Sequence, residues 1–141
     1  MMVRLAAVLL IAAFVALAII HAYWALGGKR GLSVTVPTRD GVPLFKPGPF
    51  LTALVAAAFL AAAFLVMGRV HWIGGLPPFC FYWGLWALAV VLLLRAVGDF
   101  QSAGLFKRVR DTEFARWDTC FYSPLCLVLA SCAFVVARGA P

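Results

Sequence analysis

The residues best able to do chemistry lie at the ends of long apolar runs. Arg95 interrupts the run VVLLLRAVGDF, and Asp99 follows it by four positions. Residues four apart share a helix face, so we expect an ion pair between Arg95 and Asp99. Asp118 opens another apolar stretch, DTCFYSPLCLVLA, and is placed to join that pair. Ionisable groups are costly near hydrocarbon, so this grouping indicates either a structural network or a functional site.

Pro124 interrupts the stretch that Asp118 opens. Proline has no amide hydrogen, so the carbonyl of Cys120 loses its helical partner. Either the helix kinks there, or it restarts with Ser123 as N-cap and Pro124 at the first helical position. A restart would present unpaired amide hydrogens and the positive end of a helix dipole at the membrane edge, which is an anion-binding arrangement.

Four long apolar runs surround these polar residues. The chain has 141 residues, of which 65% are hydrophobic and only 12% charged, whereas soluble domains are about a quarter charged. Each run is close to the roughly 20 residues that cross a hydrocarbon core. The expected fold is therefore an all-α membrane protein, a single four-helix transmembrane domain over residues 1–141 with spans at about 5–26, 50–68, 79–97 and 118–137.

The basic residues divide unequally between the two ends of such a bundle. Loops 28–49 and 99–117 hold four each, whereas the opposite side has only Arg4, Arg69 and Arg138. The positive-inside rule places both basic loops in the cytoplasm and both termini outside. The net charge of +7 then reflects topology and attraction to anionic lipid headgroups, and no nucleic-acid partner is expected.

The first basic loop carries the signals of a short hairpin. Val34 and Val36 alternate with polar residues, Asp40-Gly41 is a turn signal, and Val42 and Leu44 alternate after it. This pattern predicts two short strands lying across the cytoplasmic end of the bundle.

The third loop mixes large apolar residues with basic ones, which is typical of an amphipathic helix on the inner leaflet. Thr112 is expected to cap a helical turn that leads into the fourth span. The apolar residues of this pattern are Phe106, Val109, Phe114 and Trp117.

Antiparallel spans bring the ends of the first and third spans beside the starts of the second and fourth. The polar residues of these segments are therefore expected to gather at the cytoplasmic end. His21, Asp99 and Asp118 are acid/base candidates, because burial tunes the pKa of such groups. The expected ligand-binding residues are His21, Tyr23, Trp24, Arg95, Asp99, Asp118, Tyr122 and Ser123.

Small residues recur one turn apart in the second span: Ala57 with Ala61, and Ala58 with Ala62. Such surfaces pack helices together in lipid. They suit either a homodimer face or packing inside the bundle, and we favour packing inside the bundle.

No metal or cofactor is expected. The four cysteines contain no C-x-x-C pair, and the two histidines belong to opposite sides of the membrane. Motifs for nucleotide binding, zinc chemistry and serine hydrolysis are all missing from the sequence.

Two stretches, HAYWALGG and VGDF followed by GLFKRVRDTEFARWDTCFYSPLCLVLA, resemble a bacterial membrane family known as domain of unknown function 3995. The similarity covers nearly the whole chain. The resemblance implies a four-helix protein of the bacterial inner membrane. It implies no activity, and it supplies no catalytic residues.

The function expected from these patterns is binding of a small anionic or amphipathic ligand, or an accessory role, through the cytoplasmic polar cluster. The alternatives are a membrane-embedded enzyme acting on a lipid-like substrate and a dimeric small-molecule transporter. The expected partners are membrane lipids, including anionic headgroups, with a homodimer or a larger membrane complex left open.

Overall fold

The computed structural model describes residues 1–39 and 42–139. The fourth span is one helix that α4, the π-helical turn η2 and α5 form without a break. The structure thus has four helices long and apolar enough to cross a membrane, which confirms the expected all-α membrane fold. The elements in order are α1 (Met2–Ala25), the 3₁₀ turn η1 (Leu32–Val34), β1 (Thr38–Arg39), β2 (Val42–Pro43), α2 (Pro49–Arg69), α3 (Pro78–Val97), α4 (Glu113–Trp117), η2 (Asp118–Tyr122) and α5 (Ser123–Gly139).

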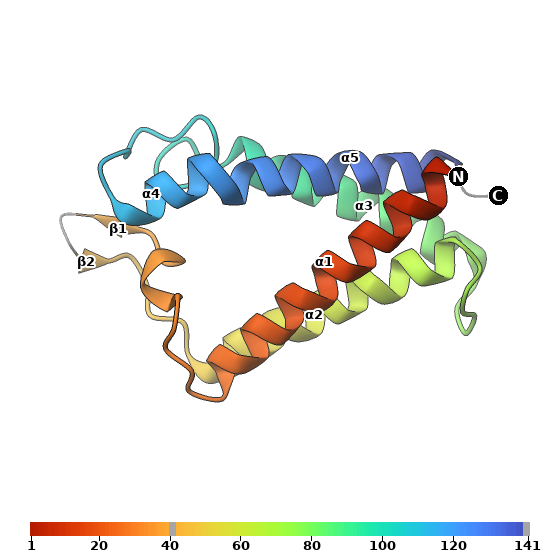
Figure 1. The fold of residues 1–141 in the computed structure, drawn as a ribbon, viewed down its shortest axis with the longest axis horizontal. Coiled ribbons are helices and arrows are strands. Elements are labelled where there is room, and N and C mark those ends of the chain that lie inside the picture. Colours follow the sequence, from red (N-terminus) through yellow and green to blue (C-terminus); the bar gives the residue numbers. More distant parts are fainter. Residues whose placement is uncertain (40–41, 140–141) are drawn as a thin grey trace.

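The four helices form two pairs, α1 with α2 and α3 with α5 (Figure 1). The pairs meet at the end that holds both chain termini and loop 70–77, which we call the closed end. They diverge toward the opposite end, the open end, where loops 26–48 and 98–112 lie. Both basic loops therefore share one end of the molecule, as the sequence predicts.

The largest cluster of buried apolar residues lies mainly toward the closed end of the bundle. Lipid tails are as apolar as these side chains, so the helices are held by close packing, which small residues permit. Eight of the fifteen residues of this core are accordingly alanine. Its members are Ala6, Ala7, Leu10, Phe14, Ala62, Ala63, Val66, Leu85, Ala89, Leu92, Leu129, Ala130, Ala133, Val136 and Ala137.

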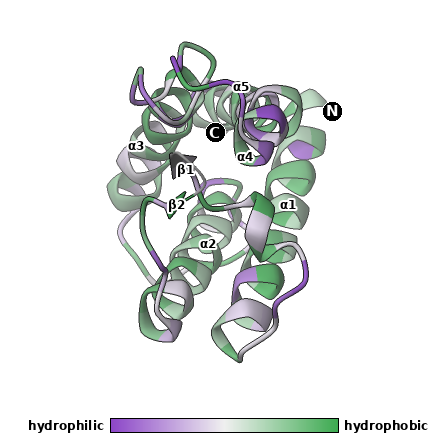
Figure 2. Cartoon of the chain, turned by 90° about the vertical axis from the view of Figure 1, so that its left-hand side faces the viewer, coloured by the Kyte–Doolittle hydropathy of each residue, from purple (hydrophilic) through white to green (hydrophobic). Residues whose placement is uncertain are grey.

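Hydrophilic residues gather in the loops and around α4 at the open end, whereas the four helices are mainly hydrophobic (Figure 2). Loop 26–48 begins at the α1–α2 pair, and its turn η1 contacts α4 on the other pair. The polar loops therefore connect the two helix pairs where the apolar core does not.

The expected hairpin is confirmed, although it is shorter than predicted. β1 and β2 pair antiparallel, with Thr38 opposite Pro43. Val34 does not extend the first strand, because it belongs to η1. The predicted turn residues Asp40-Gly41 lie outside the described part of the chain.

The helix expected in the third loop is found only in its last five residues. Thr112 caps α4 as predicted, because its Oγ1 accepts the N–H of Ala115 at 3.1 Å. Phe106 and Val109 lie outside the helix, in a segment with a left-handed glycine, Gly104 (φ 92°). α4 continues into the fourth span, so it extends that helix and does not form a separate surface element.

The alanines of α2 pack differently from the expectation. Ala57, Ala58 and Ala61 are exposed, and of the two pairs only Ala62 is buried, next to Ala63. α2 therefore turns a different set of small residues toward the bundle than the one-turn repeats indicated. The exposed alanines lie on the outer surface of the bundle.

We expect Gly68→Ala to destabilise the closed end. A Cβ atom at Gly68 would collide with the ring of Phe81, which is buried where α2 meets α3. Overpacking of this kind costs about 1–3 kcal/mol of unfolding free energy, measurable as a lower thermal midpoint in detergent. Gly74→Ala is the control, because a Cβ there meets nothing within 4 Å. Equal midpoints for the two variants would contradict the prediction.

Candidate functional site

Asp118 is the centre of a polar network at the open end, and its side chain is completely buried. Arg95 donates from Nη2 to its Oδ1 at 2.8 Å. The backbone N–H of Gly104 and the Nζ of Lys107 donate to its Oδ2 at 2.7 and 3.0 Å. Both carboxylate oxygens therefore have partners, two of them cationic, and such charge-assisted bonds are the strong ones.

Lys107 is the member of this network that the sequence analysis missed. It entered there only as one of the four basic residues of loop 99–117. It is 2% exposed. Its ammonium donates to the carbonyl of Gly104 at 2.9 Å and to Thr119 Oγ1 at 2.7 Å, besides Asp118. All three ammonium hydrogens are thus used, which is what a buried lysine requires.

A tight turn after α3 positions these donors. Gly98 and Gly104 both have φ of 92°, and a Cβ on either would collide with the backbone of the other. The turn is fixed to α3 by the N–H of Leu105, which donates to the carbonyl of Ala96 at 2.9 Å. The two glycines, six residues apart, are the sequence signal that marks this turn.

Asp99 lies apart from the network, so the expected Arg95–Asp99 pair is wrong. Its Oδ1 accepts the backbone N–H groups of Gln101, Ser102 and Ala103 at 2.9, 2.7 and 2.9 Å. Its slight burial raises the pKa of the Asp99 carboxyl, but these three hydrogen bonds outweigh it and hold that pKa below its ordinary value. The backbone N–H groups of its own turn stabilise the Asp99 carboxylate. The guanidinium of Arg95 pairs with Asp118 instead.

Of the two alternatives at Pro124, a kink or a restart, the restart with Ser123 as N-cap is wrong. Ser123 has helical angles (φ −69°, ψ −45°), and its N–H donates to the carbonyl of Asp118, five residues back. This wider turn, of a kind frequent at functional sites, precedes Pro124. Asp118 and Ser123 are both fully buried, and the hydroxyl of Ser123 has no hydrogen-bond partner among the described residues.

Tyr122 joins the fourth helix to the first loop. Its hydroxyl donates to the carbonyl of Val34 at 3.4 Å. Its ring stacks on Trp117, with centroids 6.5 Å apart, and lies 6.2 Å from the ring of Phe114. This contact ties η1 to the helix that carries Asp118.

His21 and Trp24 form a second group at the end of α1. The Nδ1–H of His21 donates to the carbonyl of Leu17 at 2.8 Å, and the imidazole lies edge-on to Trp24 with centroids 5.0 Å apart. The indole N–H of Trp24 donates to the carbonyl of Arg30 at 2.8 Å. Tyr23 is exposed, and its ring lies over Gly28 in a different direction.

The eight residues predicted for the site therefore do not converge on one point. Arg95 and Asp118 are in contact, His21 and Trp24 are in contact, and Asp99 and Tyr23 belong to neither pair. The divergence of the two helix pairs separates these groups.

His21 and Trp24 line a pocket of about 360 Å³ between the end of α1, the start of α2 and the first loop. Its wall is mainly apolar, with the imidazole, the indole and two threonine hydroxyls as polar groups. The lining residues are His21, Trp24, Leu32, Thr35, Val36, Phe45, Pro47, Leu51, Thr52, Leu54 and Val55.

A family model described as protein of unknown function (DUF3995) matches residues 14–133. The chain belongs to this family. No curated protein and no solved structure matches it. The matched part of this DUF3995 protein contains both the Asp118 network and every residue that lines the pocket.

We expect Lys107→Met to destabilise the protein by about 3 kcal/mol, because removing one partner of a buried pair leaves the other charge uncompensated. The measurement is the unfolding free energy, or the thermal midpoint, in mild detergent. Arg108→Met is the matched control, since Arg108 is exposed and adjacent, and surface changes stay within about 0.5 kcal/mol. A Lys107→Met protein as stable as this control would show that the network does not hold the fold.

Proposed function

We propose that this DUF3995 protein binds a small amphipathic anion in the pocket at its open end. The pocket is the observation that carries the proposal. Its volume of about 360 Å³ falls in the range of small-molecule sites, roughly 300–1,000 Å³, which combine apolar walls with a few polar groups. Leu51, Leu54 and Val55 on α2 provide the wall for an apolar body.

His21 offers the polar contact inside the pocket. A carbonyl can only accept, so Nδ1 carries the hydrogen directed at Leu17, and Nε2 of the neutral ring keeps a lone pair. Nε2 makes no hydrogen bond with the described residues. In the neutral ring, Nε2 can accept a hydrogen bond from a ligand hydroxyl or acid group. In the protonated ring, it can donate one to an anion.

Two basic residues are close to lining residues along the chain or through a hydrogen bond. Lys46 lies between the lining residues Phe45 and Pro47 in the sequence. The indole N–H of the lining residue Trp24 donates to the backbone carbonyl of Arg30. This arrangement favours a ligand with an anionic head and an apolar body.

The same geometry favours binding over catalysis. Of the three acid/base candidates, only His21 lines the pocket. Asp118 is engaged by Arg95, Gly104 and Lys107, and Asp99 caps its own turn. A ligand in the pocket would therefore meet one imidazole without a paired carboxylate.

We further propose that the open end faces the cytoplasm of a bacterial cell, with both termini outside the inner membrane. The distribution of eight loop bases against three at the other end supports this orientation. Anionic lipids are then natural partners of the basic loops, and a homodimer or a larger complex stays a prediction.

We expect Leu54→Trp to abolish retention of the ligand, because the larger side chain fills the pocket. The measurement is native mass spectrometry of the protein purified in mild detergent, which detects a retained small molecule as added mass. Leu60→Trp is the control on the same helix, since Leu54 and Leu60 are 56% and 54% exposed and only Leu54 lines the pocket. An adduct that survives Leu54→Trp, or that is missing from the unsubstituted protein, would refute the proposal.

We expect Gly74→Cys, but not Ser33→Cys, to react with a membrane-impermeant thiol reagent added to intact cells. Both positions are exposed, Gly74 at the closed end and Ser33 at the open end. Permeabilised cells should label both, and the unsubstituted protein measures the background of the four native cysteines. Labelling of Ser33→Cys from outside would reverse the orientation.

A further inference from the structure

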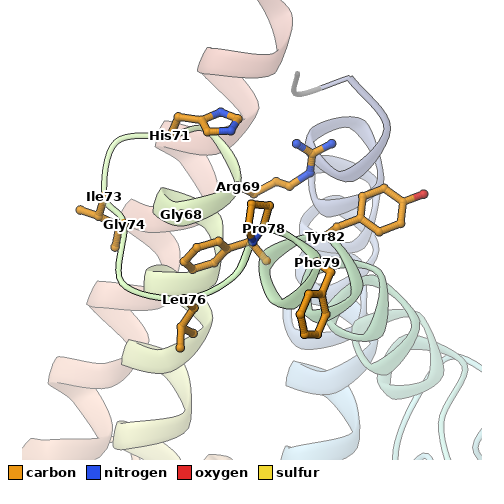
Figure 3. A pocket seen from close by; sticks show the side chains of 10 residues that line it. Gly68, Arg69, His71, Ile73, Gly74, Leu76, Pro78, Phe79 and Tyr82 are labelled. Atoms are coloured by element: carbon orange, nitrogen blue, oxygen red, sulfur yellow. The ribbon is translucent and has the colours of Figure 1, made fainter.

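A second pocket lies at the closed end, far along the bundle from the pocket of His21. It has a volume of about 500 Å³ and is formed where α2 ends, loop 70–77 turns and α3 begins (Figure 3). Ile73, Leu76 and Phe79 belong to its apolar wall, and Arg69, His71 and Tyr82 are its hydrogen-bonding side chains.

His71 has an unusual backbone conformation for a residue with a side chain, with φ of 59°. Its N–H donates to the carbonyl of Gly68 at 3.1 Å, and the N–H of Trp72 donates to the carbonyl of Met67 at 3.0 Å. This pair of bonds is the Schellman motif, in which the left-handed position after the helix is usually glycine.

The same chain ends α1 with the same motif and does place glycine there. Gly27 has φ of 95°, and the N–H groups of Gly27 and Gly28 donate to the carbonyls of Trp24 and Tyr23. A side chain in this conformation costs free energy that glycine does not. The folded state therefore tolerates backbone strain at His71, whose imidazole lies at the wall of a pocket. Backbone strain of this kind concentrates at ligand sites.

The closed end also carries basic side chains. Arg4, Arg69 and Arg138 belong to it, whereas Asp99, Asp111, Glu113 and Asp118 belong to segment 98–122 at the open end. Arg69 donates to the carbonyl of Ala137 at 2.9 Å, and its guanidinium lies 5.5 Å from the ring centre of Tyr82. These contacts keep a positive charge at the pocket wall.

We propose that this pocket binds one anionic phospholipid of the leaflet at the closed end. The phosphate faces Arg69 and His71, whose imidazole can donate a hydrogen bond in either protonation state. One acyl chain follows Leu76 and Phe79 into the bilayer, because these two side chains are exposed beside the start of a membrane-spanning helix. The site is independent of the amphipathic ligand proposed for the open end.

The test is native mass spectrometry with a phosphatidylglycerol and a phosphatidylcholine of identical acyl chains, each titrated onto the protein in mild detergent. We expect the first bound phosphatidylglycerol to be tighter than phosphatidylcholine by about tenfold, because the choline ammonium cancels the net charge of the phosphate in phosphatidylcholine. Equal affinities for the two lipids would overturn the proposal, because they would show no selectivity for a net negative headgroup.

His71→Gly separates a binding role from a structural one. Glycine relieves the left-handed strain, so we expect a higher thermal midpoint together with about tenfold weaker phosphatidylglycerol binding. A variant that keeps its lipid affinity would remove His71 from the site. A lower thermal midpoint accompanied by lost lipid would make His71 a structural residue, and would equally overturn the proposal.

Two leucine variants locate the lipid. Leu76→Trp fills the closed-end pocket and should weaken the phosphatidylglycerol adduct, whereas Leu54→Trp fills the open-end pocket and should leave it unchanged. The opposite pattern would assign the lipid to the pocket of His21. Because the two variants report on different pockets, failure of this proposal and failure of the proposed ligand site are distinguishable.

Discussion

The buried carboxylate of Asp118 sets the arrangement of the open end. Taking a charge out of water costs several kcal/mol unless partners replace its hydration. The partners come from three places: Arg95 on α3, the backbone of Gly104 in the turn, and Lys107 farther along the loop. Satisfying one charge therefore fixes the turn after α3 against the fourth helix. It also explains why residues 98–112 fold back instead of forming a surface helix.

The two ends of the molecule are held by different forces. At the closed end, alanine-rich faces of four helices pack closely, which is how helices associate in lipid. This packing has a short range, and it does not extend to the open end, where the helix pairs diverge. There the polar loops make the connections, through the Asp118 network and through the bond from Tyr122 to Val34. The pocket of His21 is formed where the first loop lies against the end of α1 and the start of α2.

Apolar length and charge distribution were sufficient to predict the four spans and the shared end of the two basic loops. Local rules also predicted the cap at Thr112 and the short hairpin. They failed where a contact reaches across the chain. The rule for residues four apart paired Arg95 with Asp99, but Asp99 has nearer backbone donors, and Arg95 reaches Asp118 instead. Lys107 resembled its basic neighbours in sequence, and only the turn at Gly98 and Gly104 buries it.

An ionisable residue in a membrane helix is often taken as a sign of function, and this protein shows why its partners must be counted first. Asp118 and Lys107 have every polar atom engaged inside the chain, so they stabilise the fold. His21 and His71 differ, because each has an imidazole at a pocket wall that the fold does not require. Nδ1 of His21 is used, whereas its Nε2 is not, and His71 occupies a position where glycine would be more stable. Polar groups that the fold does not use are the ones left for a ligand, and in this chain they lie at opposite ends of the bundle.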